Sequence, residues 1–209
     1  MSAQKKAQQD PTTRDRILDA ALEAFAEKGF RGATTKGIAG AAKVNEVTLF
    51  RHFKSKYALF ASTLSERSPF PDIGRSVQLD TEGRIDDLLF RNVKAVLGVL
   101  RSNKQTYMVV FGDAWRHPRL RTMIGALLVR KGVEFIASFL RTQMDKGRIR
   151  RMDPEVSARA LMGMVQSYFI TTYILEGRTP EQIEEDRFVR GFVNIFLDGA
   201  RADAGGRTR

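Results

Sequence analysis

Apolar residues recur along this chain mainly at helical spacing, with neighbours three and four positions apart. No pair of strand-like runs is joined by an Asn-Gly or Asp-Gly turn. The pattern therefore predicts an all-α fold.

The first predicted helix has recognisable start and stop signals. Thr12 precedes it as a cap with Asp15 three residues on, an apolar face runs from Ile17 to Phe25, and Gly29 is the expected stop. Three short helical pieces are expected within residues 34–66, the second and third capped by Asn45 and Ser55.

The stretch Ser68-Pro69-Phe70-Pro71 interrupts the helical pattern and marks the predicted domain boundary. We expect a helix-turn-helix domain over residues 12–67 and a second domain over 68–201, with disordered tails at 1–11 and 202–209. Further helices are predicted at residues 82–101, 105–115, 119–146, 154–176 and 181–198. The last two are long enough to pair antiparallel.

Composition and charge narrow the function. The 209 residues contain no cysteine and only two histidines, which excludes disulfides, thiolate nucleophiles and Cys-type zinc sites. Thirty-five Lys and Arg against 24 Asp and Glu give a net charge of +11, which favours a polyanionic partner such as nucleic acid. No apolar run suffices for a membrane span or a signal peptide, so we expect a soluble, cytoplasmic protein.

Residues 14–60 have the spacing of a helix-turn-helix. Ile38, Ala39 and Ala42 would face inward from the first short helix, and Leu49 and Phe53 from the second. Small residues at 39 and 42 let two short helices cross steeply over a tight turn. The side chains left outward are polar or small, which suits the major groove of DNA.

Those outward positions carry the candidate DNA chemistry. Arg51 can make a bidentate contact to guanine, Thr48 can serve a phosphate or a base, and Val47 can meet a thymine methyl group. Residues 31–56 also hold six basic side chains against the single acid Glu46. The full set of predicted DNA contacts is Thr34, Thr35, Lys36, Lys43, Asn45, Glu46, Val47, Thr48, Phe50, Arg51, His52 and Lys56.

At this point the sequence resembles the amino-terminal domain of the TetR family of bacterial transcriptional regulators. The resemblance covers about 47 of the 209 residues, and Gly147-Arg148-Ile149 with Asp153-Pro154-Glu155 looks like the entry to that family's eighth helix. It implies a nine-helix, two-domain homodimer whose carboxy-terminal domain binds an effector. The matching positions are Ile17, Ala21, Phe25, Gly29, Phe30, Thr34, Ile38, Ala39, Ala42, Val44, Thr48, Leu49, Phe50, His52, Phe53, Ser55, Lys56 and Leu59.

Three positions depart from the family pattern. Lys43 stands at a turn position that is usually glycine, and Phe50 replaces the usual tyrosine of the recognition helix. Glu46 stands where a basic or neutral residue is common; it repels phosphates but could accept from a cytosine amino group. The operator sequence therefore cannot be carried over from the family.

The larger domain is rich in bulky, adaptable side chains that would suit an apolar effector cavity. Each could equally be ordinary core, and Trp115, near the end of its predicted helix, is the preferred pocket residue. The candidate ligand contacts are Phe90, Met108, Phe111, Trp115, Met123, Phe135, Phe139, Met164 and Tyr168.

The last predicted helix carries a broad apolar stripe that something must cover. We expect it to pair with the preceding helix in a four-helix interface between two copies of the chain. The candidate interface residues are Tyr168, Phe188, Val189, Phe192, Val193 and Phe196.

Taken together, the sequence predicts a ligand-responsive, sequence-specific DNA-binding regulator, most simply a repressor released from a palindromic operator by an apolar or amphipathic molecule. We expect no catalytic residues, metal or cofactor, since G-x-S-x-G and phosphate-cradling motifs are missing. The alternatives are a constitutive DNA-binding protein without effector, a helical adaptor and a helical enzyme. The effector and the sign of regulation stay open.

Overall fold

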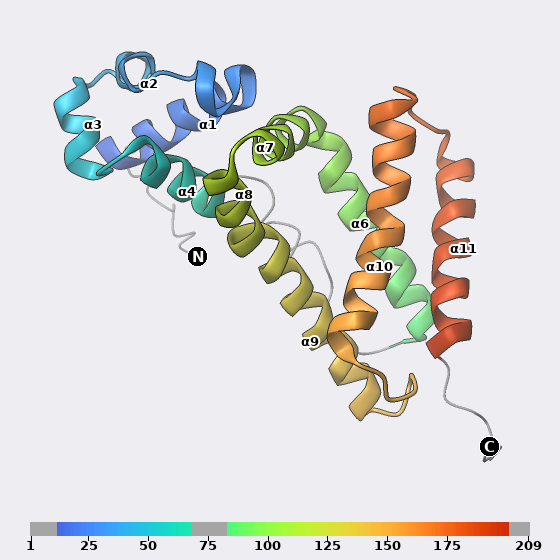
Figure 1. The fold of residues 1–209 in the computed structure, drawn as a ribbon. Coiled ribbons are helices and arrows are strands. Elements are labelled where there is room, and N and C mark those ends of the chain that lie inside the picture. The colour runs from blue at the N-terminus through green and yellow to red at the C-terminus, as the bar shows by residue number, and fades with distance from the viewer. Residues whose placement is uncertain (1–11, 68–82, 201–209) are drawn as a thin grey trace, which may run out of the picture.

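A computed structural model describes residues 12–67 and 83–200 of the chain (Figure 1). Within these ranges all regular structure is helical and no strand occurs. The two tails expected to be disordered and the interruption at Ser68-Pro69-Phe70-Pro71 lie outside the described residues.

Four helices form the amino-terminal bundle. Their starts follow the predicted caps: the Thr12 side chain accepts from the Asp15 amide in a capping box, and Thr34, Asn45 and Ser55 accept from amides three residues on. The helices are α1 (Thr13–Gly32), α2 (Thr35–Ala41), α3 (Glu46–His52) and α4 (Lys56–Glu66).

Helix α1 does not stop at Gly29 as expected. The backbone breaks there, with a φ of 69°, and then makes a further turn to Gly32. Gly29 therefore interrupts the helix but does not end it, because the chain resumes helical geometry beyond it.

The remaining helices form the larger part of the molecule. Two stretches change to π-helical geometry without ending, so α8, η1 and α9 run as one helix and α10 continues into η2. Counted this way, the described residues contain nine continuous helices. The bounds are α6 (Ile85–Ser102), α7 (Lys104–Arg116), α8 (Pro118–Ile124), η1 (Gly125–Arg130), α9 (Lys131–Asp145), α10 (Pro154–Tyr168), η2 (Phe169–Leu175) and α11 (Gln182–Ala200).

Two hydrophobic clusters hold the helices together. The first fills the amino-terminal bundle, and α7 and α8 complete it with Val110, Ala114, Leu120 and Ile124. The second lies among α6, α7, α9, α10, η2 and α11. Phe111 of α7 packs against both clusters. Helix α7 therefore lies between the amino-terminal bundle and the rest of the molecule, as Figure 1 shows.

An ionic network joins α6, η2 and α11 inside the larger part. Glu185 is 3% exposed, and its carboxylate accepts hydrogen bonds from the Lys94 ammonium and the Tyr173 hydroxyl. Arg101 lies 3.5 Å from the same carboxylate, and Lys94 also bridges to Asp186 at 2.7 Å. Each charge in this network has an opposite charge beside it, which offsets the cost of burying it.

Candidate nucleic-acid interface

The helix-turn-helix is formed by α2, a tight turn and α3. Ile38, Ala39 and Ala42 are buried beneath the turn, and Leu49 is buried beneath α3, all as the sequence pattern predicts. The short side chains at 39 and 42 bring the two helices close enough for the turn to close.

Lys43 occupies the turn in a left-handed conformation, with a φ of 55°. Its amide donates to the Gly40 carbonyl at 3.0 Å, and the Val44 amide donates to the Ala39 carbonyl at 3.0 Å. This is the Schellman ending of a helix, in which glycine is usual at the Lys43 position. The side chain is exposed, so its ammonium is free to meet a phosphate.

Helix α3 presents a compact outward face. The Asn45 side chain accepts from the Thr48 amide at 2.7 Å and fixes the start of the helix. Val47 is 78% exposed, and Phe50, Arg51 and His52 are also exposed. A rigid helix with apolar, cationic and imidazole groups on one exposed face can enter a major groove and read base edges.

Glu46, at the first position of α3, is tied to α2. The Thr35 hydroxyl donates a hydrogen bond to Glu46 Oε1 at 2.5 Å. Both residues were expected to meet DNA, and in the structure their side chains meet one another. The contact holds the carboxylate at the helix start, where the helix dipole favours a negative charge.

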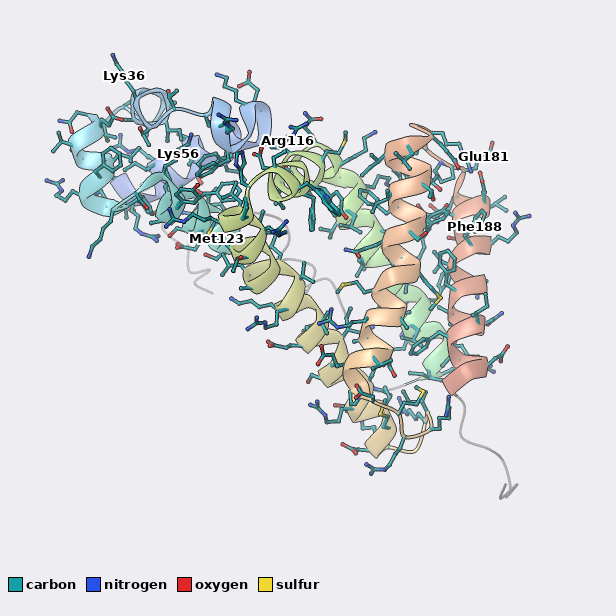
Figure 2. All side chains as sticks on the ribbon, in the orientation of Figure 1. Lys36, Lys56, Arg116, Met123, Glu181 and Phe188 are labelled. Carbon is teal, nitrogen blue, oxygen red and sulfur yellow. The ribbon has the colours of Figure 1, made fainter. Side chains whose placement is uncertain are left out.

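The basic side chains around α3 differ in their surroundings. Lys36 points from α2 into open space, and Arg51 and Lys54 are exposed (Figure 2). Lys56, also expected to contact DNA, lies with its ammonium 4.8 Å above the Phe30 ring and donates to the Arg31 carbonyl at 3.4 Å. Burial lowers the pKa of this ammonium, and the nearby Asp113 carboxylate opposes that shift only in part.

The predicted ligand contacts do not share one environment. Phe139 and Tyr168 are buried, and Met108 is exposed. Trp115 was expected to line the apolar interior, yet it is 83% exposed because it lies on the α7 face opposite Val110 and the first cluster. The half-buried members are Phe90, Phe111, Met123, Phe135 and Met164.

Two grooves open on the surface near α1. One, of about 410 Å³, lies between the end of α1 and α7 and includes Met108, Asp113 and Arg116 in its lining. The other, of about 200 Å³, lies between α1 and α2. Met108 is the one predicted ligand contact that either groove contains, so an effector site among the remaining side chains stays a prediction.

The apolar stripe of α11 divides into an inner and an outer part. Val189, Val193 and Phe196 are buried in the second cluster together with Tyr168 of α10, so most of the expected interface packs inside this chain. The buried side of the stripe includes residues expected at the interface, because the sequence alone could not show which side of the stripe α6 covers. The apolar residues of α11 left wholly or partly accessible are Ile183, Phe188, Phe192 and Ile195.

Sequence reasoning missed Asp113. Its carboxylate accepts a hydrogen bond from the Phe30 amide at 2.5 Å, which links α7 to the break in α1. No local pattern marks a contact between residues this far apart in the sequence, so only the packing of α7 on α1 could show it.

The described residues contain no group of three or more His, Cys, Asp or Glu side chains placed to hold a metal ion. None of the described helices has the length and apolar character needed to cross a lipid bilayer.

Comparison with known proteins gives two family matches. Residues 17–63 match the model of bacterial regulatory proteins of the tetR family. Residues 88–199 match the model of the carboxy-terminal domain of AefR-like transcriptional repressors. The second match alone spans more than half of the chain.

Individual relatives agree over nearly the whole length. An uncharacterized HTH-type transcriptional regulator of Bacillus subtilis strain 168, YvkB, is 29% identical over 194 residues, which cover 91% of this chain and 98% of that protein. The flavonoid-responsive regulator FrrA has a similar structure, with a TM-score of 0.78 at 20% identity over 92% of this chain and 98% of that one. FadR from Bacillus subtilis, solved with stearoyl-CoA, gives 0.70 at 18% identity over 88% and 97%.

Proposed function

Because the chain belongs to the TetR family of bacterial regulatory proteins, whose members bind DNA, we propose that it is a homodimeric, ligand-responsive repressor of transcription. In this proposal two copies bind a palindromic operator and release it when an apolar or amphipathic small molecule binds.

The observation that carries the DNA-binding part is the exposed face of α3. Val47, Phe50, Arg51 and His52 lie together on a helix whose start is capped and whose inner face is buried. The basic groups Lys36, Lys43 and Lys54 flank it and suit the phosphates on either side of a groove.

The dimer is supported by the accessible faces of α10 and α11. Ile195 is 68% exposed, and the half-buried Phe188 and Phe192 lie along the same helix. Exposed small residues of α10, Gly163 and Ser167, would let a second copy approach closely. A two-fold dimer would place two copies of α3 in successive major grooves, about 34–36 Å apart.

The effector part is supported by similarity and by composition. One similar structure carries stearoyl-CoA, and the name of another describes it as flavonoid-responsive. Half-buried, adaptable side chains such as Met164 and Phe90 border the second cluster and could move aside for such molecules. A regulator that binds DNA constitutively is the alternative, because most predicted ligand contacts belong to a packed core.

The first experiment selects genomic fragments that the full-length protein retains and measures their affinity by fluorescence anisotropy at several salt concentrations. Arg51→Ala should cost about 1–3 kcal/mol on the selected site and relax its base preference. Lys36→Ala should weaken all sequences alike and lower the slope of log affinity against log salt by about one.

The outcomes separate the candidate functions. Equal loss for Arg51→Ala on selected and random DNA would refute base reading by α3. DNA binding that never discriminates between sequences would indicate a non-specific DNA-binding protein, and no DNA binding at all would indicate an adaptor. Long-chain acyl-CoA thioesters and flavonoids are the first effectors to add, and a panel that leaves operator affinity unchanged would favour the constitutive alternative.

A further inference from the structure

A carboxylate of α7 completes the backbone of α1 where that helix breaks. A break in a helix leaves amide groups without partners in the helix itself. At this break the Phe30 amide donates to Asp113 Oδ2 at 2.5 Å. A residue of the larger domain therefore supplies the hydrogen bond that the first domain lacks.

The break is also shaped to admit that carboxylate. Gly29 has a φ of 69°, a conformation that side chains with a Cβ adopt at a cost. A Cβ built on Gly29 would lie 3.0 Å from Asp113 Oδ2. Glycine therefore avoids backbone strain at this position and leaves room for the close approach of Asp113.

The residue that Asp113 holds is central to the first domain. The centroid of the buried Phe30 ring lies 4.7 Å from the ring centroid of Tyr57 and 5.3 Å from that of Phe60, both on α4. The Lys56 ammonium lies above the Phe30 ring. Fixing Phe30 therefore fixes how α1 meets α4. Helix α4 directly follows the recognition helix α3 and its turn.

The same helix face anchors α7 in the first cluster. Val110 and Ala114, which flank Asp113 along α7, are buried with the residues of the amino-terminal bundle. On the next face, Tyr107 is buried in the second cluster and stacks on Phe111 at 4.3 Å. A movement of α7 must therefore reach both clusters.

We propose that Asp113 is a positioning residue for DNA binding, which holds the helix-turn-helix bundle and α7 together so that DNA contact at α3 and changes in the larger domain reach one another. The hydrogen bond to Phe30 sets the position of α1 relative to α7, and the apolar contacts of α7 transmit movements between the two clusters. This inference rests on the proposed DNA-binding function.

The first test needs no DNA. Amide hydrogen exchange at Phe30 should be about tenfold faster in Asp113→Ala than in the wild-type protein, because the acceptor is gone. Asp113→Asn keeps an acceptor oxygen of the same shape and should retain most of the protection. Unchanged exchange at Phe30 in Asp113→Ala, or equal loss in both variants, would overturn the hydrogen-bond assignment.

The second test uses the single tryptophan of the chain, Trp115, which lies two residues from Asp113 on the same helix. A selected DNA fragment should change the Trp115 emission of the wild-type protein. In Asp113→Ala that change should be lost and DNA affinity, read separately by anisotropy, should fall about 5-fold or more. Asp113→Asn should restore both, and Glu134→Gln, at an exposed carboxylate of α9, should behave as wild type.

The other possible results of the second test separate the role of Asp113 from the proposed DNA-binding function. DNA binding with unchanged Trp115 emission in the wild-type protein would overturn the transmission role while leaving the proposed function intact. A full emission change in Asp113→Ala would do the same. A protein that bound no DNA would overturn both the proposed function and this role, and thermal unfolding of each variant identifies any that fail to fold.

Discussion

Lys43, in the turn of the helix-turn-helix, is a position where DNA binding and the stability of the free protein are expected to oppose one another. Lys43 adopts a left-handed φ of 55°, which costs a residue with a Cβ about 1 kcal/mol relative to glycine. The cost was expected from the sequence because a lysine stands where the resembling family usually has glycine. The exposed ammonium offers a reason to keep it, since it can pair with a DNA phosphate.

Lys43→Gly should therefore stabilise the free protein and weaken its DNA complex. We expect the free energy of unfolding, measured with urea, to rise by about 0.5–1 kcal/mol. DNA affinity should fall for all sequences, with a salt slope lower by about one. Lys36→Gly is the control, because α2 is helical there and glycine should destabilise it. A destabilised Lys43→Gly protein would contradict the account of strain.

At the scale of the element, the sequence predicted helices well where local signals mark their ends. The segment predicted at residues 105–115 is α7 (Lys104–Arg116), and that at 181–198 is α11 (Gln182–Ala200). His117-Pro118 and Asp153-Pro154 begin helices where expected, because proline favours the first turn. Periodicity also separated the inward and outward faces of α3 correctly.

Features that depend on distant residues were not predictable. Helix α1 resumes after Gly29, and there Asp113, 84 positions after Gly29, accepts a hydrogen bond from the Phe30 amide. The ring beneath Lys56 and the pairing of Thr35 with Glu46 depend likewise on how helices pack. The π-helical stretches η1 and η2 leave no mark in apolar spacing over so few residues. Local signals fix the ends of elements, and packing fixes their partners.

The outer part of the α11 stripe gives a prediction about assembly. Ile195→Glu should convert dimers to monomers, because a glutamate buried without a partner at an interface is costly. Ile195 is a cleaner site than Phe192, which is half-buried within its own chain and contacts Tyr168. Met108→Glu, at an exposed apolar residue of α7, is the control. Light scattering that shows an intact dimer for Ile195→Glu would refute the interface.

The buried network at α6, η2 and α11 predicts how stability depends on pH. Burial alone would raise the pKa of Glu185, but hydrogen bonds from Lys94 and Tyr173 and the charges of Lys94 and Arg101 lower it on balance. A carboxyl group whose pKa is lowered by folding stabilises the protein at pH values above its unfolded value, near 4.5. That contribution is lost as the pH falls through the lower, folded value.

Glu185→Gln should remove this pH-dependent contribution. We expect the free energy of unfolding at pH 7 to fall by about 1–3 kcal/mol, because Lys94 loses a charged partner while keeping Asp186. The decrease in stability between pH 6 and 3 should be shallower in the variant than in the wild type, as measured by denaturant unfolding. Parallel pH curves would show that Glu185 does not titrate as argued.

At the scale of the whole molecule, the arrangement of cores matters more than the division into domains. Four residues of α7 and α8 complete the core of the DNA-binding bundle, and Phe111 packs against both clusters. An effector that rearranged the larger cluster could therefore reach the DNA-binding bundle through α7, or through the continuous helix α8–η1–α9, which also has residues in both clusters. A shift of a few ångströms between two copies of α3 would mismatch half-sites about 34–36 Å apart.

This arrangement predicts reciprocal coupling between effector and operator. An active member of the effector panel should weaken operator binding by about 5- to 150-fold, and the operator should weaken effector binding by the same factor, because the two effects close one thermodynamic cycle. Phe111→Leu, which trims the side chain shared by both clusters, should reduce that factor. Trp115→Ala should leave that factor unchanged, since the indole is 83% exposed.

The two coupling factors are measured separately. Anisotropy titrations of operator with and without effector give one, and calorimetric titrations of effector with and without operator give the other. A coupling factor that falls in Trp115→Ala and not in Phe111→Leu would move the effector site to the exposed face of α7 and remove the shared core from the mechanism.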